Sequence, residues 1–144
     1  MLDCLIIGDS IGVGIAKAMP QCEPRVKGGI SSRGLNLSSG TTPLGARVVV
    51  ISLGTNDAGI NTYYELLRLR GRVRADKVYW IVPPIRPAAQ NAVRTVAQHF
   101  GDKTITISHD KLSADGIHPT GRGYQGLVNE MENETPKGKN NGRL

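Results

Sequence analysis

Short runs of apolar residues alternate along the chain with longer segments in which apolar residues recur every three or four positions. The runs are predicted to be strands and span Leu2 to Ile7, Arg25 to Lys27, Arg47 to Leu53, Lys77 to Val82 and Thr104 to Ser108. The stretch from Val48 to Ile51 is β-branched throughout and has no polar alternation. This composition is typical of a strand that is buried on both faces.

The intervening segments have helical periodicity. We expect helices over residues 12–19, briefly after residue 32, and over 61–74, 88–100 and 120–131; the fourth carries Ala88, Ala92, Val96 and Phe100 at four-residue steps. Regular alternation of strands and helices predicts an α/β protein, a three-layer α/β/α sandwich around a five-stranded parallel sheet. In the flavodoxin-like order 2-1-3-4-5, the ligand crevice lies at the loops that leave strands 1 and 3.

Length and composition fit one compact domain. The chain has 144 residues, 39% of them hydrophobic and 4% aromatic, so the core must be built from Ile, Val, Leu and Ala, with Tyr79 and Trp80 of the fourth strand inside it. This length excludes a catalytic domain beside a separate cofactor domain. We assign residues 1–134 to the domain and residues 135–144, which carry almost nothing apolar, to a disordered basic tail.

The excess of positive charge raises the question of an anionic partner. Lys and Arg number 18 against 12 Asp and Glu, a net charge of +6, and three of these charges lie in residues 135–144. A second group, Arg68, Arg70, Arg72 and Arg74, ends the third predicted helix, where cations complement the helix dipole. Its spacing does not keep it on one helical face, and it lacks interleaved aromatic residues. We therefore do not expect nucleic-acid binding.

The two cysteines, Cys4 and Cys22, lack the spacing of a zinc site. Cys4 lies in an apolar strand and is expected to act as a small, free hydrophobic residue. Neither a metal nor a cofactor is expected. The apolar run that begins at Cys4 is too short for a signal peptide or a membrane span, and it follows no basic segment. The chain is expected to be made and kept in the cytoplasm.

The first predicted strand runs into Gly8-Asp9-Ser10-Ile11-Gly12-Val13-Gly14, which allows three interpretations. As Gly-x-Ser-x-Gly it mimics the nucleophile elbow of α/β-hydrolases, but that elbow normally comes well into a longer chain. As Gly-x-x-x-Gly-x-Gly it resembles the nucleotide turn of short-chain dehydrogenases. None of the four tyrosines has the lysine four residues later that those enzymes use, and the chain is too short for their fold.

The third interpretation joins this segment to two distant ones, each predicted to lie in a loop after a strand. With Gly54-Thr55-Asn56-Asp57 and Asp115-Gly116-Ile117-His118-Pro119, it resembles the sequence blocks of the SGNH hydrolases, also called the GDSL esterase and lipase family. The resemblance extends from residue 4 to about residue 131. It implies a serine esterase without a cofactor.

The resemblance implies a role for each block. Ser10 would be the nucleophile, His118 the base that takes its proton, and Asp115 the carboxylate that orients the imidazole. The backbone N–H of Ser10 and the side-chain amide of Asn56 would stabilise the oxyanion. A third donor would come from the loop after the second strand, where one alignment selects Ser32 and a shifted one selects Gly29.

Four further residues are candidates for substrate contact: Asp9, Thr55, Arg86 and Ile117. His99 and His109 have no such context and are expected to be surface or structural residues. The implied substrates are small acyl esters, plausibly O-acetyl groups on carbohydrate, because little sequence is left for a lid or a long acyl tunnel. The alternative is a binding module that keeps the fold, has lost turnover, and holds an anionic glycan or nucleic acid.

Overall fold

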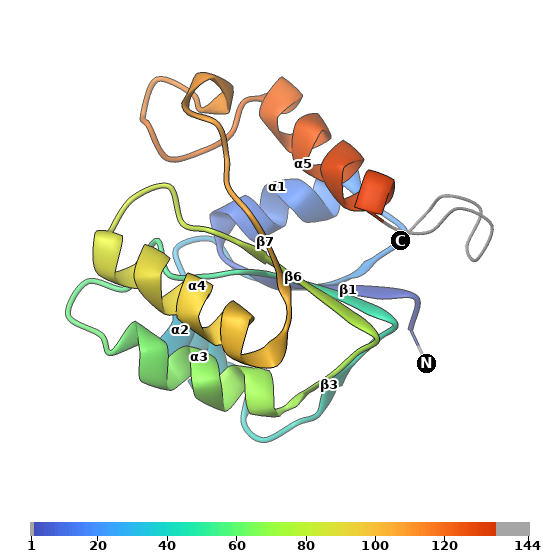
Figure 1. Ribbon diagram of the computed structural model, residues 1–144, viewed down its shortest axis with the longest axis vertical. Coiled ribbons are helices and arrows are strands. Elements are labelled where there is room, and N and C mark those ends of the chain that lie inside the picture. The colour runs from blue at the N-terminus through green and yellow to red at the C-terminus, as the bar shows by residue number, and fades with distance from the viewer. Residues whose placement is uncertain (1, 135–144) are drawn as a thin grey trace.

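The computed structural model describes residues 2–134 and has a parallel sheet between two layers of helices (Figure 1). The five strands of the sheet are β1 (Cys4–Gly8), β2 (Glu23–Val26), β4 (Val48–Ser52), β6 (Lys77–Ile81) and β7 (Lys103–Ile105). They lie in the order β2-β1-β4-β6-β7 and every neighbouring pair is parallel. This arrangement confirms the predicted strand order 2-1-3-4-5.

Helices cover both faces of the sheet. Figure 1 shows α1 (Ser10–Ala18) and α5 (Gly121–Glu134) on one side, and α2 (Ser32–Ser39), α3 (Thr62–Gly71) and α4 (Pro87–Phe100) on the other. The three-layer sandwich that the alternating pattern predicted is therefore confirmed. The predicted tail, residues 135–144, lies outside the described residues.

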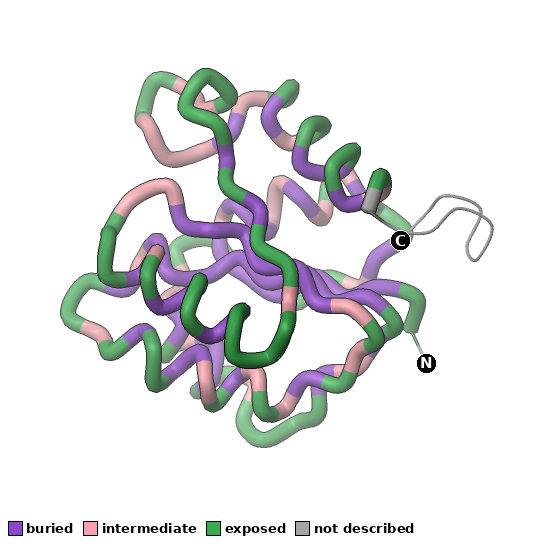
Figure 2. Tube along the Cα trace, in the orientation of Figure 1, coloured by how far each residue is buried: buried purple, intermediate pink, exposed green. Residues whose placement is uncertain are grey.

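The central strand β4 explains how one sheet supports two cores. Val49 and Ile51 contribute to the apolar cluster on the side of α2, α3 and α4, whereas Val48 and Val50 contribute to the cluster on the side of α1 and α5. Because successive side chains of a strand point to opposite faces, a strand between two helical layers must be apolar at every position. Figure 2 shows the strands as the buried centre of the molecule.

Tyr79 and Trp80 lie fully buried in β6, as their place in the fourth predicted strand indicated. The Trp80 indole also donates a hydrogen bond of 2.9 Å to Asp102, which satisfies its polar atom inside the core. Within residues 2–134, no helix is both long enough and apolar enough to cross a membrane.

The observed elements differ from the sequence pattern at their ends. The predicted helix over 61–74 stops at Gly71, and Val73–Arg74 forms strand β5, which pairs with β3 (Leu44–Gly45) in a small second sheet. Two-residue strands are too short to produce a periodic signal. The last strand ends at Ile105 instead of Ser108, and a short 3₁₀ turn, His109–Lys111, follows it.

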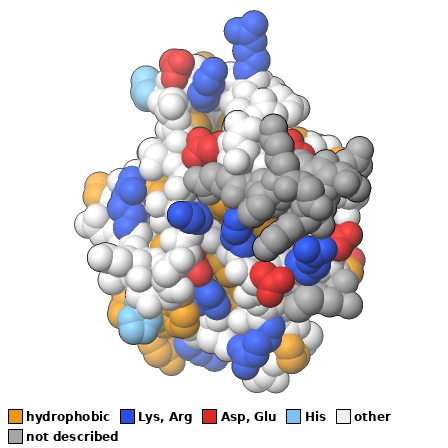
Figure 3. All heavy atoms as spheres, turned by 45° about the vertical axis from the view of Figure 1, so that its right-hand side comes forward, with side chains coloured by type: hydrophobic (Ala, Val, Ile, Leu, Met, Phe, Trp, Pro, Cys, Tyr) orange, Lys and Arg blue, Asp and Glu red, His pale blue; other side chains and the backbone are white. Residues whose placement is uncertain are grey.

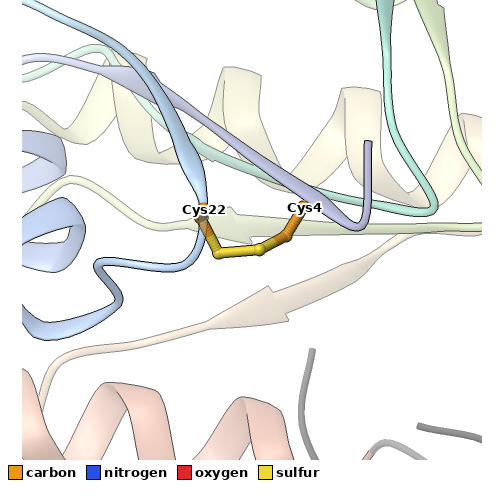
Figure 4. The surroundings of a disulfide bond; sticks show 2 residues. All are labelled: Cys4 and Cys22. Carbon is orange, nitrogen blue, oxygen red and sulfur yellow. A yellow bond between two sulfur atoms is a disulfide. The ribbon is translucent and has the colours of Figure 1, made fainter. Parts of the chain in front are cut away.

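The prediction that Cys4 is a free thiol is wrong, because Cys4 and Cys22 form a disulfide (Figure 4). Strand β1 pairs with β2 so that Leu5 lies beside Glu23, and the next pair back in this register is Cys4 and Cys22. Their Cα atoms are 4.8 Å apart, within the range that a disulfide spans. The cross-link therefore follows from strand pairing, which two isolated cysteines in a sequence do not reveal.

Candidate active site

The connections that leave the carboxyl ends of β1, β2, β4 and β6 emerge at one edge of the sheet, on the left in Figure 1. The long connection between β7 and α5, orange at the upper left in Figure 1, lies on this side as well. The three sequence blocks singled out above fall on the loops after β1, after β4 and before α5. Parallel pairing thus brings segments together that are about 50 and 100 residues apart in the sequence.

Ser10 is the first residue of α1 and follows β1 after a single residue, Asp9. Asp9 is the N-cap, and its Oδ1 accepts hydrogen bonds from the N–H groups of Ile11 at 3.0 Å and Gly12 at 3.5 Å. The Asp9 N–H donates to the carbonyl of Ser52 in β4 at 3.0 Å. These contacts hold the strand-to-helix turn and leave the N–H of Ser10, at the positive end of the helix, without an acceptor inside α1.

Asp9 does not contact solvent, which corrects its prediction as a substrate-binding residue. Its relative exposure is 0%, and burial raises its pKa to about 6, although hydrogen bonds from Ile11, Gly12 and the Ser52 hydroxyl oppose this rise. Within the described part of the chain, its Oδ2 has no hydrogen-bond partner. Asp9 therefore positions Ser10 and cannot touch a ligand in the crevice.

A chain of hydrogen bonds joins Ser10 to His118 and Asp115. The Ser10 hydroxyl lies 2.8 Å from Nε2 of His118, and Nδ1 of the same ring lies 2.7 Å from Oδ2 of Asp115. The Ser10–His118 contact spans 108 positions of the sequence. With Nδ1 protonated and bonded to the carboxylate, Nε2 is left to accept the proton of the hydroxyl.

The Asp115 carboxylate also organises the loop that carries His118. Its Oδ1 accepts hydrogen bonds from the backbone N–H of Ile117 at 2.9 Å, the backbone N–H of His118 at 3.0 Å and the hydroxyl of Ser113 at 2.8 Å. The bond with the His118 ring is the main cause that holds the Asp115 pKa well below its usual range, and these three donors add to it. The carboxylate therefore stays ionised in moderate acid.

The loops after β2 and β4 are tied to each other. The Asn56 amide donates to the carbonyl of Ile30 at 3.1 Å, which uses one of its two amide hydrogens. The next residue, Asp57, is 5% exposed and accepts from the N–H of Ser32 at 2.9 Å, the hydroxyl of Ser32 at 2.5 Å and the hydroxyl of Thr62 at 2.8 Å. Asp57 thus joins α2, α3 and the Asn56 loop.

These contacts bear on the third oxyanion donor. Both donors of Ser32 are bound to Asp57, and Ser32 is 1% exposed, so its N–H is not available to an oxyanion in this conformation. Gly29 is exposed at the tip of the turn, has φ +78°, and has open space where a Cβ would stand. Of the two predicted donors, Gly29 is exposed, whereas Ser32 is buried with its N–H bound to Asp57.

The remaining predicted substrate contacts lie at different depths. Thr55 is only 7% exposed, and its carbonyl accepts a hydrogen bond of 2.7 Å from Nε of Arg86. Arg86 is exposed, and Ile117 is half-buried on the loop of His118. His99 and His109 are exposed and lie outside the hydrogen-bonded group, as expected.

Two residues near the site were not singled out by the sequence. Asp57 offered no signal beyond its place after Asn56 in the second sequence block. Tyr124 of α5 packs against Gly14 of α1, so closely that a Cβ on Gly14 would stand 2.1 Å from the Tyr124 ring. Burial raises the pKa of Tyr124, and the nearby charges of Asp9 and Asp115 raise it further. Tyr124 therefore joins α5 to α1 close to both carboxyl groups.

Comparison with known proteins gives the fold. No protein-family model matches the sequence, and no curated protein matches it. Among solved structures, a lipase/acylhydrolase from Enterococcus faecalis is similar with a TM-score of 0.62 and 19% identity, covering 88% of this chain and 91% of that chain. A GDSL-like lipase from Bacteroides thetaiotaomicron has a TM-score of 0.56 and 18% identity, covering 88% and 83%. An acylhydrolase structure from Bacteroides fragilis has a TM-score of 0.62 and 19% identity, and the match covers 92% of this chain and 85% of that chain.

This chain therefore has the fold of these acylhydrolase and GDSL-like lipase structures, as its sequence blocks indicated. The strand order and the two helical layers belong to that fold, whereas the Ser-His-Asp hydrogen bonds are observed in this chain itself. Because identity with these structures is below 20%, what the chain does must be argued from its own site.

Proposed function

We propose that this protein is a serine esterase that hydrolyses small acyl esters, with O-acetyl groups on carbohydrate as its natural substrates. The observation that carries the proposal is the continuous hydrogen-bonded chain from the Ser10 hydroxyl through His118 to Asp115. A serine hydroxyl is a weak nucleophile unless a positioned base removes its proton. The site supplies such a base and fixes its tautomer.

The reaction would proceed in two balanced halves. Ser10 Oγ attacks the ester carbonyl while its proton moves to Nε2 of His118, and the imidazolium is stabilised by Asp115. The proton then passes to the departing alcohol, which leaves an acyl-Ser10. Water attacks this ester, gives a proton to His118, and the acid is released as the proton returns to Ser10.

The negative charge that forms on the carbonyl oxygen needs donors that are already in place. The free N–H of Ser10 and the second amide hydrogen of Asn56 are suited to this role, with Gly29 as the third donor. Each donor of this kind typically contributes about 3 kcal/mol, or roughly 10²–10³-fold in rate. The bond between Asn56 and the Ile30 carbonyl would hold the amide in one orientation.

A small substrate fits the short loops around the site. The connection after β1 is one residue, the one after β6 covers residues 82–86, and the one after β4 covers residues 53–61. The longer connection between β7 and α5 carries His118 and is bound to the Asp115 carboxylate, so it is not free to act as a lid over a long acyl chain.

The alternative of a binding module for an anionic partner gains little support. Arg68 lies 3.8 Å from Glu65, Arg70 forms an ion pair of 2.7 Å with Asp102, and Arg72 donates to the Ser39 hydroxyl at 2.7 Å. On the face in Figure 3, Lys and Arg side chains are interspersed with acidic and uncharged ones. Three of the arginines at the end of α3 thus have partners within the fold.

The decisive test is hydrolysis of a short-chain nitrophenyl ester, together with labelling by a fluorophosphonate probe. Wild type should hydrolyse the ester and be labelled at Ser10, and Ser10→Ala should lose both properties. Ser38→Ala, an exposed serine of α2, is the matched control and should behave as wild type. Equal rates for wild type and Ser10→Ala would overturn the proposal.

A second variant tests the tautomer argument. In Asp115→Asn the amide oxygen can still accept the three bonds that hold the loop, but an amide N–H replaces the oxygen that faces His118. The ring would then carry its proton on Nε2 and could not accept one from Ser10. We expect kcat to fall by about 10⁴-fold while the fold is retained.

A further inference from the structure

Arg86 stands apart from the other arginines in its backbone conformation. With φ +68°, it is the only residue other than glycine that has a positive φ within residues 2–134. It also precedes Pro87, which restricts its backbone further. A side chain with a Cβ occupies this region only at a cost in free energy, and such costs concentrate at functional sites.

Within residues 2–134, one nitrogen of the Arg86 side chain is bound to the protein, and its two terminal amino groups are not. Nε donates to the carbonyl of Thr55 at 2.7 Å, and Thr55 is the residue directly before Asn56 in the sequence. Among the described residues, neither terminal amino group of Arg86 has a hydrogen-bond or ion-pair partner. By contrast, Arg70 uses its guanidinium on Asp102 in a two-pronged ion pair. The two amino groups of Arg86 form a fork of parallel donors that matches a carboxylate.

A shallow groove of about 380 Å³ lies between the start of α3 and the first half of α4, and one of its lining residues, Ala88, follows Arg86 by two positions. Both helices begin at the carboxyl edge of the sheet, where the Ser10 loop also lies. Its lining residues include Asn61, Asn91, Thr95 and Tyr63, which carry amide, hydroxyl and aromatic groups. These groups are suited to the hydroxyls and the ring face of a sugar.

We propose that Arg86 is a specificity-determining residue that binds a carboxylate on the alcohol part of the substrate, so that the preferred ester is an acetylated acidic sugar. This inference rests on the proposed esterase function and deepens it. An acetyl group carries no charge, so the anion must belong to the alcohol. The ring of that sugar would lie along the groove.

The test compares two sugars that differ in one group. The two esters are mono-O-acetylglucuronic acid and mono-O-acetylglucose, acetylated at the same hydroxyl. At C6 the first carries a carboxylate and the second a neutral CH₂OH. The measured quantity is the ratio of kcat/KM for the acid to that for the neutral ester, from the release of acetate. We expect wild type to prefer the acid and Arg86→Gln, which keeps a donor for Thr55, to reduce the ratio by about 10- to 100-fold.

Two variants and one further ester sharpen the result. Arg86→Lys keeps the charge but loses the parallel donors, so its ratio should fall between those of wild type and Arg86→Gln. Arg94→Gln removes an exposed arginine farther along α4, which contacts Thr106, and should leave the ratio unchanged. Mono-O-acetylglucose 6-phosphate distinguishes the anion, and a preference for it over the carboxylate would overturn the assignment.

Failure of this inference is distinguishable from failure of the proposed function. If wild type hydrolyses both sugars and Arg86→Gln leaves the ratio unchanged, the esterase proposal stands and the role of Arg86 is refuted. If wild type hydrolyses neither ester, the esterase proposal fails for these sugars, and calorimetric binding to Ser10→Ala still decides the role of Arg86. Tighter binding of the acid that disappears in Ser10→Ala/Arg86→Gln would support it, and equal binding of the two sugars would refute it.

Discussion

Truncation of Asp57 tests whether one buried carboxyl group holds the two loops of the candidate oxyanion site together. Asp57 is 5% exposed and accepts three hydrogen bonds of 2.5 to 2.9 Å, two from Ser32 and one from Thr62. Asp57→Ala removes all three and leaves the backbone N–H of Ser32 buried without a partner. The hydroxyls can rotate toward other acceptors, whereas the N–H cannot.

The expected loss of stability is large for a single residue in a loop. Hydrogen bonds to a charged group contribute about 1.5–3 kcal/mol each, and a stranded buried donor costs about 1–3 kcal/mol. Because the three bonds share one acceptor group, they do not add fully, and we expect a decrease of about 3–5 kcal/mol in the free energy of unfolding. Asp57→Asn keeps an acceptor for the Ser32 N–H and should lose far less.

Urea unfolding and ester hydrolysis measure the two consequences separately. Asp57→Ala should also lower kcat/KM by about 10- to 100-fold, because the Ser32 and Asn56 loops are no longer held in register. Asp76→Ala, a truncation of an exposed aspartate, is the matched control and should stay within about 0.5 kcal/mol of wild type. A loss below 1 kcal/mol in Asp57→Ala would refute the energetic reasoning. Full activity in a destabilised protein would refute the link between the loops.

Three further predictions follow from burial, cross-linking and close packing. Burial raises the pKa of Asp9 to about 6 in the folded state, from 3.8 in the unfolded chain. The contribution of protonated Asp9 to the free energy of unfolding is therefore complete below pH 3.8, and about 3 kcal/mol of it should be lost between pH 4 and 7. Urea titrations of Asp9→Asn across this range should show a flatter dependence on pH. The disulfide joins positions 18 residues apart, so reduction should lower the free energy of unfolding by about 3 kcal/mol, and an unchanged urea midpoint would contradict this. Gly14→Ala must displace the Tyr124 ring and should cost about 1–3 kcal/mol by thermal melting, whereas Gly126→Ala, with open space around it on the same pair of helices, should be neutral or stabilising.

Much of the fold was predictable because its signals are local and strong. The run from Val48 to Ile51 is typical of a strand covered on both faces, and the alternation of strands with helical segments led to the observed strand order. Element ends were less predictable. Strands β3 and β5 have two residues each and are defined by their pairing with each other, so no periodic pattern in the sequence predicts them.

The residues of the candidate site were also predictable only in part. The resemblance of three sequence blocks to those of the SGNH hydrolases implied Ser10, Asn56, Asp115 and His118 as one group. Their place after predicted strands agreed with it, because a parallel sheet gathers these loops at the carboxyl ends of its strands. The same reasoning placed Asp9 in the crevice. Its side chain is instead turned inward to cap α1 and meet Ser52, a choice that depends on the packing of β4 against β1.

The sequence by itself determined which chemical groups are available. They are a serine, a histidine and a carboxylate in loops of an α/β protein, and a core that contains few aromatic residues. Only the tertiary structure decided which groups meet. Pairing of β1 with β2 set Cys4 against Cys22, and folding across 108 positions placed His118 2.8 Å from Ser10. It also bound both donors of Ser32 to Asp57 and left the fork of Arg86 open. Contacts of this kind depend on distances in space, which one-dimensional patterns do not contain.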